Sequence, residues 1–331
     1  MYINALIEKN TCFVRTTDGD FKFNPSVSLY KRSDKGQYHC PVDKVNLEKV
    51  EFAKVSQARK YIKQYKEAFP VYGQEDFTLQ TINNQYGHLD PVSTADMTIM
   101  SIDIEVDVPD GAGFPDPSKA EWPVNAITLT DKNKGRIYAF SFYDWDKDLA
   151  VERGELPAEV ANQVLYRKVE NEEALFNLFF NIWKNRTPHI ITGWNSNGFD
   201  MTYMYNRASK IVPSKEDMLS PWNKITKREF TNDYGEEQTN VKIKGVAMLD
   251  YMELYKKFTY TTRDSYKLNN IAHIELGEDK ISYDEEKSLY TLAQNDPQKI
   301  VSYNIWVAVL VDRLDDKLNL VNLVTQVAYI S

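Results

Sequence analysis

The sequence predicts an α/β protein: a mixed β-sheet with flanking helices, preceded by a smaller α+β domain. The length of 331 residues suits two domains of about 100–200 residues each. From residue 97 onward, three strand-like segments are followed by a helix, a strand and a helix, the order typical of a sheet covered by helices. Before residue 95 the pattern is different, with short strands followed by one amphipathic helix.

Residues 1–95 are expected to form the smaller domain. TCFVR, FKFN and VSLYKR are strand-like, and QARKYIKQYKEAF places apolar residues at helical spacing, namely Ala58, Ile62, Tyr65 and Phe69. The polar stretch NNQYGHLDPVSTAD follows and predicts a domain boundary.

Residues 96–316 are expected to form the larger domain. MTIMSIDIEV alternates apolar and polar residues with the period of a strand. NAITLTD and RIYAFSFYD predict two further strands, EEALFNLFFNIWKN an amphipathic helix, HIITGW a buried strand and FDMTYMYNRASKI another helix. KITKREF and TNVKIKGVAMLDY flank the turn NDYG and predict a hairpin that continues into a strand ending at Asp250. Asp296 followed by Pro297 predicts the start of the last long helix.

Residues 317–331 contain the apolar stretch LVNLVTQVAYIS. We expect nothing in the chain to remain for this stretch to pack against. The sequence therefore predicts a fragment of a longer protein, truncated soon after the larger domain.

Composition excludes several classes of protein. Apolar residues make up 42% and charged residues 27%, so disordered and fibrous proteins are excluded. No apolar run approaches the roughly 20 residues of a membrane span, and the charged start argues against a secretion signal, so an intracellular protein without a membrane partner is expected. The cysteines and histidines show no disulfide or zinc-ligand spacing: Cys12, Cys40, His39, His88, His189 and His273.

The charge is unevenly distributed along the chain. The formal net charge is −8, but residues 1–95 hold 13 Lys and Arg against 11 Asp and Glu, so the remainder carries −10. A negative net charge argues against a nucleic-acid partner. Carboxylates that hold divalent cations can nevertheless bind phosphates, because the metal inverts the local charge.

Asp103 and Glu105 are the first candidates for chemistry. Residues at i and i+2 of a strand point to the same face with Cα atoms roughly 6–7 Å apart, so both carboxylates can reach one cation. The alternative is a solvent-exposed edge strand. The apolar opposite face, formed by Met100, Ile102 and Ile104, indicates a central strand instead.

The segment GWNSNGFD, residues 193–200, is the second candidate. It has the G-x-x-x-x-G spacing of a phosphate-binding loop, but Phe199 and Asp200 stand where that loop requires Lys and Ser or Thr. Asn195, Phe199 and Asp200 remain at a strand-to-helix junction. Asp200 is either a helix N-cap or a carboxylate at the carboxyl edge of the sheet, where open α/β folds bind ligands.

Three further features each allow two interpretations. Tyr303 is either a core residue or a phenol that reaches a metal-bound water. The run YKKFTYTTR, residues 255–263, interleaves bases and aromatics as single-strand binders do, or it is a solvated helix end. The basic hairpin over residues 224–244 either contacts phosphates or is an ordinary exposed ribbon.

Taken together, DIE at 103–105, Asn195-x-x-x-Phe199-Asp200 and Tyr303 in a late helix resemble the three exonuclease motifs of family B DNA polymerases. Within that family the likeness is strongest to the replicative polymerases of T-even bacteriophages. FPDPSKAEW, NAITL, PHIITGWN, LDYMELYKKF and VSYNI also resemble the family, so the likeness covers nearly the whole chain. It implies an RNase H-like exonuclease domain over 96–316, the family's N-terminal domain over 1–95, and the start of a segment returning to the N-terminal domain or palm over 317–331.

The resemblance also implies 3′–5′ proofreading, the hydrolysis of the terminal nucleotide of a frayed primer strand by two Mg²⁺ or Mn²⁺ ions. It assigns cation binding to Asp103, Glu105 and Asp200, and orientation of the attacking water to Tyr303. The residues that it places around the single-stranded end are Asn195, Phe199, Phe114, Lys256 and Lys257.

One position departs from the family pattern. The third motif is Tyr-x-x-x-Asp, and four residues after Tyr303 this chain has Val307, which cannot bind a metal. Asp312 lies five residues further, about 140° around the helix, and is a poor substitute. We therefore expect strongly reduced or absent exonuclease activity with an intact fold.

The palm signatures of the family are also absent, so the chain alone is not expected to synthesise DNA. The resemblance implies primer-template DNA as a partner, RNA through the N-terminal domain, and a sliding clamp and replisome through a missing C-terminal part, in the cytoplasm of a phage-infected bacterium. Two alternatives remain open: a non-catalytic module of the same fold that binds single-stranded DNA or RNA, and a free-standing exonuclease.

Overall fold

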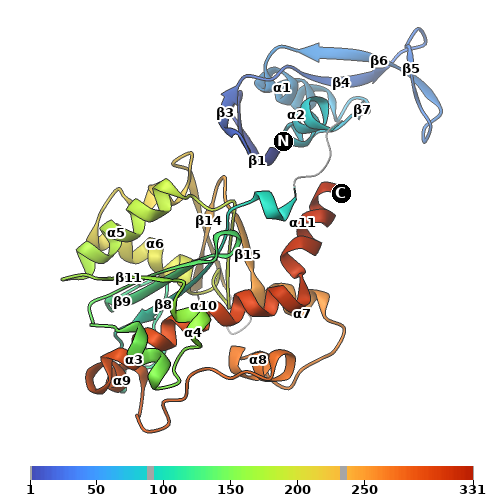
Figure 1. Cartoon of the computed structure of the whole chain (residues 1–331). Helices are drawn as coiled ribbons and strands as arrows, with labels where there is room; N and C mark the ends of the chain where they lie inside the picture. Colours follow the sequence, from blue (N-terminus) through green and yellow to red (C-terminus); the bar gives the residue numbers. More distant parts are fainter. Residues whose placement is uncertain (1, 88–92, 232–236, 331) are drawn as a thin grey trace. The chain divides into compact units, whose positions relative to one another are not determined.

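The computed structural model describes residues 2–87, 93–231 and 237–330, and the chain divides into two compact units, residues 1–92 and 93–331 (Figure 1). The division falls close to the boundary expected near residue 95. His88, part of the polar stretch at that boundary and the hairpin turn NDYG lie outside the described residues.

The first unit contains two small antiparallel sheets and two helices. The first sheet has the order β1-β2-β3 and the second the order β5-β6-β4-β7. The predicted helix is α1, but it ends at Tyr65, so Phe69 is outside it and 43% exposed. The second helix, α2, was not predicted. The bounds are β1 Tyr2–Glu8, β2 Thr11–Thr16, β3 Gly19–Phe23, β4 Val27–Arg32, β5 Tyr38–Cys40, β6 Val45–Phe52, β7 Val71–Tyr72, α1 Val55–Tyr65 and α2 Phe77–Tyr86.

The second unit is built on a six-stranded mixed sheet with the order β11-β10-β9-β8-β12-β15. β8, β9 and β10 pair antiparallel, whereas β11, β12 and β15 each pair parallel to their neighbours. The predicted strands are therefore present, and β11 is an edge strand that the sequence pattern did not reveal. The bounds are β8 Ile99–Val106, β9 Val124–Asp131, β10 Arg136–Ser141, β11 Val164–Lys168, β12 Ile190–Gly193 and β15 Ala247–Asp250.

Helices cover both faces of this sheet, which confirms the predicted fold class. On one face, α5 (Glu172–Asn185) and α6 (Asp200–Ile211) pack Phe176, Phe179 and Met201 into a core with Met100 and Ile102 of β8. On the other face, α10 (Pro297–Leu318) crosses β8 and β9. The polar face of β8 is therefore turned toward α10.

The start of α10 is the one predicted from the sequence. Asp296 is its N-cap and accepts a hydrogen bond from the Lys299 N–H, and Pro297 is its first residue. A proline at this position lacks only an N–H that would have no partner in the helix. The remaining elements of the unit are β13 Ile225–Thr231, β14 Glu237–Ile243, α3 Lys147–Glu152, α4 Ala158–Ala161, α7 Tyr251–Phe258, α8 Leu268–Leu276, α9 Leu289–Asn295 and α11 Leu320–Ile330, with 3₁₀ turns at Thr94–Asp96, Lys132–Lys134 and Glu216–Leu219.

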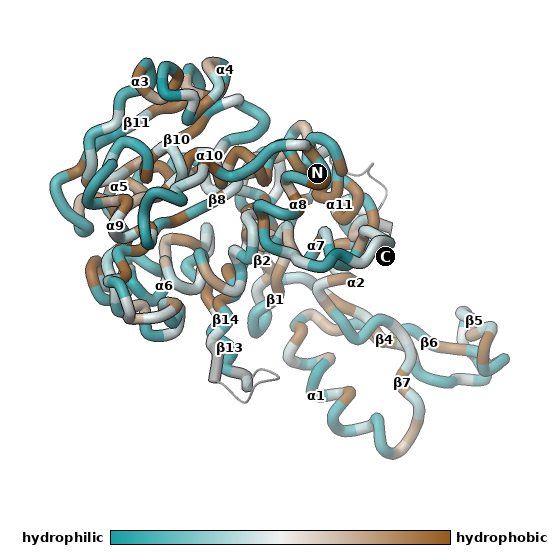
Figure 2. The backbone as a smooth tube through the Cα atoms, turned by 90° about the horizontal axis from the view of Figure 1, so that it is seen from below, coloured by the Kyte–Doolittle hydropathy of each residue, from teal (hydrophilic) through white to brown (hydrophobic). Residues whose placement is uncertain are grey.

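The described part of the segment 317–331 forms the end of α10 and then α11, which is largely hydrophobic (Figure 2). Leu320 and Val321 are buried, and α11 packs against α7. The expectation that nothing remains for this stretch to pack against is thus wrong for its first turn. Leu323 and Val327, one turn apart, are exposed, as is Ala328.

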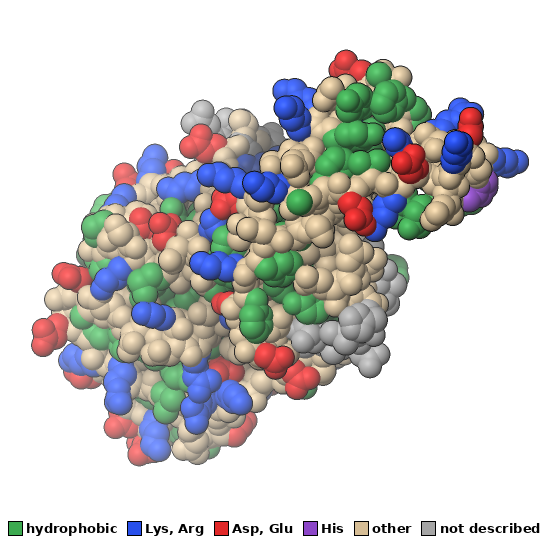
Figure 3. Space-filling model, turned by 90° about the horizontal axis from the view of Figure 1, so that it is seen from above, with side chains coloured by type: hydrophobic (Ala, Val, Ile, Leu, Met, Phe, Trp, Pro, Cys, Tyr) green, Lys and Arg blue, Asp and Glu red, His purple; other side chains and the backbone are tan. Residues whose placement is uncertain are grey.

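Over the described part of the chain, no helix combines the length and the apolar character needed to cross a membrane. Lysine and arginine side chains alternate with acidic ones over the face shown in Figure 3. The negative charge of residues 96–331 therefore does not exclude basic groups from the surface.

Candidate active site

The carboxylates of Asp103 and Glu105 lie on β8 in the middle of the sheet. Glu105 is only 8% exposed, and Asp103 is half-buried. Because β8 has β9 on one side and β12 on the other, the alternative of a solvent-exposed edge strand is wrong. The face that carries both side chains also carries Ser101 and is directed toward α10.

Asp200 joins these two residues from a different part of the chain. It is the first residue of α6, and its Oδ1 accepts a hydrogen bond from the backbone N–H of Ile104 at 3.1 Å. Ile104 lies between Asp103 and Glu105 in β8, so the Asp200 carboxylate is held against the strand at this point. Phe199 occupies the N-cap position and makes no capping bond, so the interpretation of Asp200 as a helix N-cap is wrong.

The three carboxylates influence one another electrostatically. Burial raises the pKa of Asp103, and the charge of Glu105 raises it further. Burial likewise raises the pKa values of Glu105 and Asp200, and each also feels a neighbouring carboxylate of the cluster. Buried like charges favour the protonated form, and a cation placed among them reverses this preference.

Tyr303 of α10 and Lys280 complete the cluster. Tyr303 is 6% exposed, and burial together with the charges of Glu105 and Asp103 raises the pKa of its phenol, which therefore keeps its proton. The Lys280 ammonium donates a hydrogen bond to the Tyr303 hydroxyl at 3.1 Å, and its charge lowers the pKa values of Asp103 and Glu105. Sequence reasoning missed Lys280, since it lies in an irregular segment with no motif around it.

Asn304 is a second residue that sequence reasoning missed. Its Nδ2 donates to Oδ2 of Asp103 at 2.8 Å, and its Oδ1 accepts from the Thr128 hydroxyl at 2.6 Å. This chain of bonds fixes the orientation of the Asp103 carboxylate. The available signal was the position of Asn304, which directly follows Tyr303 on the helix.

Val307 lies one turn after Tyr303 and is buried, 4% exposed. Asp312, the acid of this helix closest in sequence to Val307, accepts a hydrogen bond from the Ser101 hydroxyl at 2.5 Å. Ser101 is two residues before Asp103 on β8, roughly 6–7 Å away along the strand. The structure therefore places Asp312 beside the neighbouring position of the strand.

The residues proposed to contact a nucleic acid fall into two groups. Phe199 and Phe114 contact each other, with ring centroids 5.2 Å apart, and Phe114 is 80% exposed. Asn195 begins the loop that leads to Phe199 and has a left-handed backbone with φ of 65°. Lys256 and Lys257 instead lie at the end of α7, where Lys256 pairs with Glu253 and each lysine lies near an aromatic ring.

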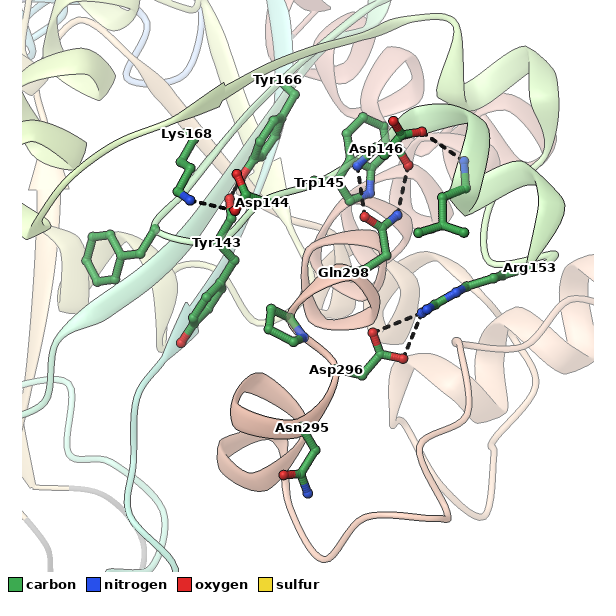
Figure 4. A pocket seen from close by; sticks show the side chains of 13 residues that line it. Tyr143, Asp144, Trp145, Asp146, Arg153, Tyr166, Lys168, Asn295, Asp296 and Gln298 are labelled. Carbon is green, nitrogen blue, oxygen red and sulfur yellow. Dashed lines mark hydrogen bonds and ion pairs between the residues drawn. The ribbon is translucent and has the colours of Figure 1, made fainter.

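A pocket of about 870 Å³ lies elsewhere in the unit, between the ends of β10 and β11 and the start of α10 (Figure 4). Its polar side chains are largely paired with one another. Lys168 binds Asp144, Arg153 binds Asp296, and Gln298 bonds to the backbone of Asp146. None of the carboxylates of the candidate site lines it, so this pocket is separate from the candidate site.

The chemistry of the cluster matches a divalent cation, because Mg²⁺ and Mn²⁺ prefer carboxylate oxygens. The described hydrogen bonds engage Oδ2 of Asp103 and Oδ1 of Asp200. Among the described residues, however, no three His, Cys, Asp or Glu side chains lie close enough together to hold a metal ion as they stand. The donor set therefore fits the ion in kind, while its arrangement is incomplete.

Comparison with known proteins points to one family. Residues 42–271 match the model of the exonuclease domain of DNA polymerase family B. The chain is 33% identical over 293 residues to the DNA-directed DNA polymerase of Escherichia phage RB69 and 32% identical over 293 residues to that of Enterobacteria phage T4; each alignment covers 84% of this chain and 32% of the relative. A DNA polymerase catalytic subunit of Psittacid herpesvirus 1 is 29% identical over 170 residues, which is 50% of this chain and 15% of the relative. The chain thus spans about a third of the length of the two phage relatives.

Proposed function

The chain belongs to DNA polymerase family B through its exonuclease domain, and from this premise we propose that its second unit is a proofreading module that binds the single-stranded 3′ end of a primer. Its reaction is the hydrolysis of the terminal phosphodiester bond. We further propose that this reaction is strongly reduced in this chain because of Val307.

The placement of Asp103 and Glu105 on one face of β8, with Asp200 bonded to the N–H of Ile104 between them and Tyr303 electrostatically coupled to both, carries this proposal. Asp103, Glu105 and Asp200 would hold the divalent cations. When bound, such ions activate a water molecule and stabilise the charge that develops on the leaving oxygen.

The other side chains position the reacting groups. The Tyr303 phenol keeps its proton and donates a hydrogen bond to the attacking water or to a phosphate oxygen. Lys280 supplies a positive charge beside the carboxylates. Phe114, which is exposed, and Phe199 offer aromatic faces on which the bases of an unpaired strand stack.

Val307 removes one oxygen donor from this arrangement. The side chain stands where the family pattern has an aspartate, and valine offers a cation only methyl groups. Loss of a partner in the outer shell of a metal typically reduces affinity or activity about 10–100-fold, and the loss of a direct ligand should reduce it at least as much.

The test compares the chain with Val307→Asp on a 5′-labelled single-stranded oligonucleotide in Mg²⁺ or Mn²⁺. We expect Val307→Asp to shorten the oligonucleotide from its 3′ end at least about tenfold faster, and Mn²⁺ to raise its melting temperature more than that of the unaltered chain. Val307→Ile is the matched control, because it changes the side chain without adding an oxygen. Equal cutting by the unaltered chain would refute the role of Val307, and a folded, Mn²⁺-binding Val307→Asp that does not cut would refute the exonuclease.

A non-catalytic module that holds a single strand is the second candidate function. The buried valine and the exposed Phe114 favour it, since stacking needs no cation. Two results together would identify this function: tight binding of the oligonucleotide by the unaltered chain in EDTA, and no cutting by Val307→Asp in Mg²⁺ or Mn²⁺.

The partners of a complete polymerase form part of the same proposal. We propose primer-template DNA in the cytoplasm of a phage-infected bacterium as the setting, with a sliding clamp and replisome contacted by polymerase regions other than this chain. The near-neutral first unit, with a net charge of +2 over residues 1–95, is the proposed site for RNA.

A further inference from the structure

Asp250 is a buried carboxylate next to the candidate active site that the sequence motifs do not include. It ends β15, is 4% exposed, and is the N-cap of α7. β15 pairs in parallel with β12, and Asp250 lies directly opposite Gly193. Gly193 is followed by Trp194 and the loop that leads to Phe199 and Asp200, so Asp250 faces the start of this loop.

The carboxylate of Asp250 accepts more hydrogen bonds than a helix cap needs. Its Oδ1 accepts from the N–H groups of Met252 at 3.1 Å and Glu253 at 3.4 Å, which is the usual N-cap arrangement. The same Oδ1 accepts from the N–H of Asn195 at 3.1 Å, and Oδ2 accepts from the N–H of Asn197 at 3.0 Å. One side chain thus ties the first turn of α7 to the loop between β12 and α6.

The backbone of the loop turns at Asn195. Asn195 has a φ of 65°, in the left-handed region that glycine and, among residues with side chains, asparagine and aspartate adopt most readily, and in this conformation its N–H donates to Asp250 at 3.1 Å. Its carbonyl accepts from the N–H of Phe199 at 2.9 Å, so its conformation sets where Phe199 begins α6. Asp200 comes next and reaches back to the N–H of Ile104.

We infer that Asp250 is a positioning residue for the exonuclease reaction, holding the loop 194–199 so that Asp200 reaches β8. The role of Asp250 in a reaction rests on the proposed function. The fixation of the loop 194–199 by Asp250, which we call the clamp, rests on the hydrogen bonds alone. Both oxygens of Asp250 are turned toward backbone N–H groups of the loop and helix. The residue therefore acts through the loop and is not a further cation ligand.

The test uses Asp250→Asn, which keeps the size of the side chain but replaces one accepting oxygen with an N–H₂ donor. We expect amide hydrogen exchange over residues 194–200 to become at least about tenfold faster. In the Val307→Asp background, the same change should lower kcat for oligonucleotide cutting about 10–100-fold.

Asp146→Asn is the matched control. Asp146 is also an N-cap in this unit, bonding the N–H groups of Asp148 and Leu149 of α3, and it makes no bond to the loop. Its replacement should leave both the exchange over 194–200 and the kcat of the Val307→Asp background unchanged.

The outcomes separate this inference from the proposed function. Faster exchange over 194–200 in Asp250→Asn supports the clamp even if Val307→Asp never cuts, in which case the exonuclease fails alone. Unchanged exchange over 194–200 in Asp250→Asn overturns the clamp, whatever the activity of Val307→Asp. If Val307→Asp cuts, faster exchange with an unchanged kcat for Asp250→Asn in that background overturns the positioning role.

Discussion

At the scale of residues, the candidate site depends on how buried polar groups find partners. Asp103 is oriented by Asn304, and Asn304 in turn by Thr128. A buried polar atom without a partner is unfavourable by about 1–3 kcal/mol. The hydrogen bond between Thr128 and Asn304 therefore restricts the orientation of Asn304, and the bond from Asn304 restricts that of Asp103. A similar hydrogen bond joins Asp312 to Ser101, which lies two residues before Asp103 on the same strand.

Asp312 gives a pH prediction. Burial raises its pKa from the ordinary value near 4 to about 6, and the charge of Asp316 also raises it. Hydrogen bonds from Ser101 and Thr130 and the charge of Lys132 lower the pKa, but by less. A carboxyl whose pKa is raised by folding stabilises the folded state below its unfolded pKa, and this contribution is lost as the pH rises through about 6. The free energy of unfolding in urea should therefore rise for Asp312→Asn relative to the unaltered chain between pH 4 and pH 7. The expected rise is up to about 3 kcal/mol, at about 1.4 kcal/mol per pKa unit.

Asp144→Asn serves as the control for this measurement, because Asp144 is 89% exposed and is not among the groups that shift the pKa of Asp312. A difference between Asp312→Asn and the unaltered chain that stays constant from pH 4 to pH 7 would contradict the prediction.

At the scale of elements, one ion pair joins the two helices on the same face of the sheet. Arg207 of α6 makes a bidentate contact with Glu172 of α5, with both distances 2.7 Å, and donates to the carbonyls of Ala120 and Glu121. Glu172 also accepts from the N–H of Val124 at the start of β9. The pair therefore fixes α5, α6 and the segment before β9 together, and α6 carries Asp200.

Arg207→Ala should destabilise the second unit by about 3–5 kcal/mol, because it leaves the nearly buried Glu172 without its positively charged partner; the two side chains are 11% and 12% exposed. Denaturant unfolding measures this change. Lys168→Ala, in the exposed pair with Asp144, should lose less than about 1 kcal/mol. An Arg207→Ala variant as stable as Lys168→Ala would show that the pair does not hold the helices.

At the scale of the whole molecule, the two units have separate hydrophobic cores. The core of the first unit includes Val14, Leu29 and Val55, whereas that of the second includes Ile102 and Phe179. A domain with its own core can in principle fold alone, and stability rises with the fraction of surface that folding buries.

Residues 93–331 produced as a separate polypeptide should therefore fold. We expect a mixed α/β circular dichroism spectrum and one cooperative unfolding transition, with a midpoint close to that of the second unit in the whole chain. A non-cooperative transition would show that the first unit is needed for the fold of the second.

Much of the fold could be predicted because local pattern and tertiary environment agree. The alternation around Asp103 predicted β8, and Asp296-Pro297 predicted the start of α10, since both signals act within a few residues. Short elements such as β11 and α2 were missed because packing, more than propensity, decides them. The RNase H-like exonuclease assignment depended on the order of motifs, and the family match supports it.

The sequence by itself determined the candidate residues that we propose for the chemistry: three acids and a tyrosine, with a valine where the family pattern has an acid. Only the tertiary structure decided that Asp200 is held on β8 instead of capping its helix, that Lys280 and Asn304 join the cluster, and that Asp250 binds the loop. The physical reason is distance along the chain. These hydrogen bonds join residues separated by tens to hundreds of positions. They form only when folding brings distant segments together around the carboxyl edge of the sheet, and no local sequence pattern records them.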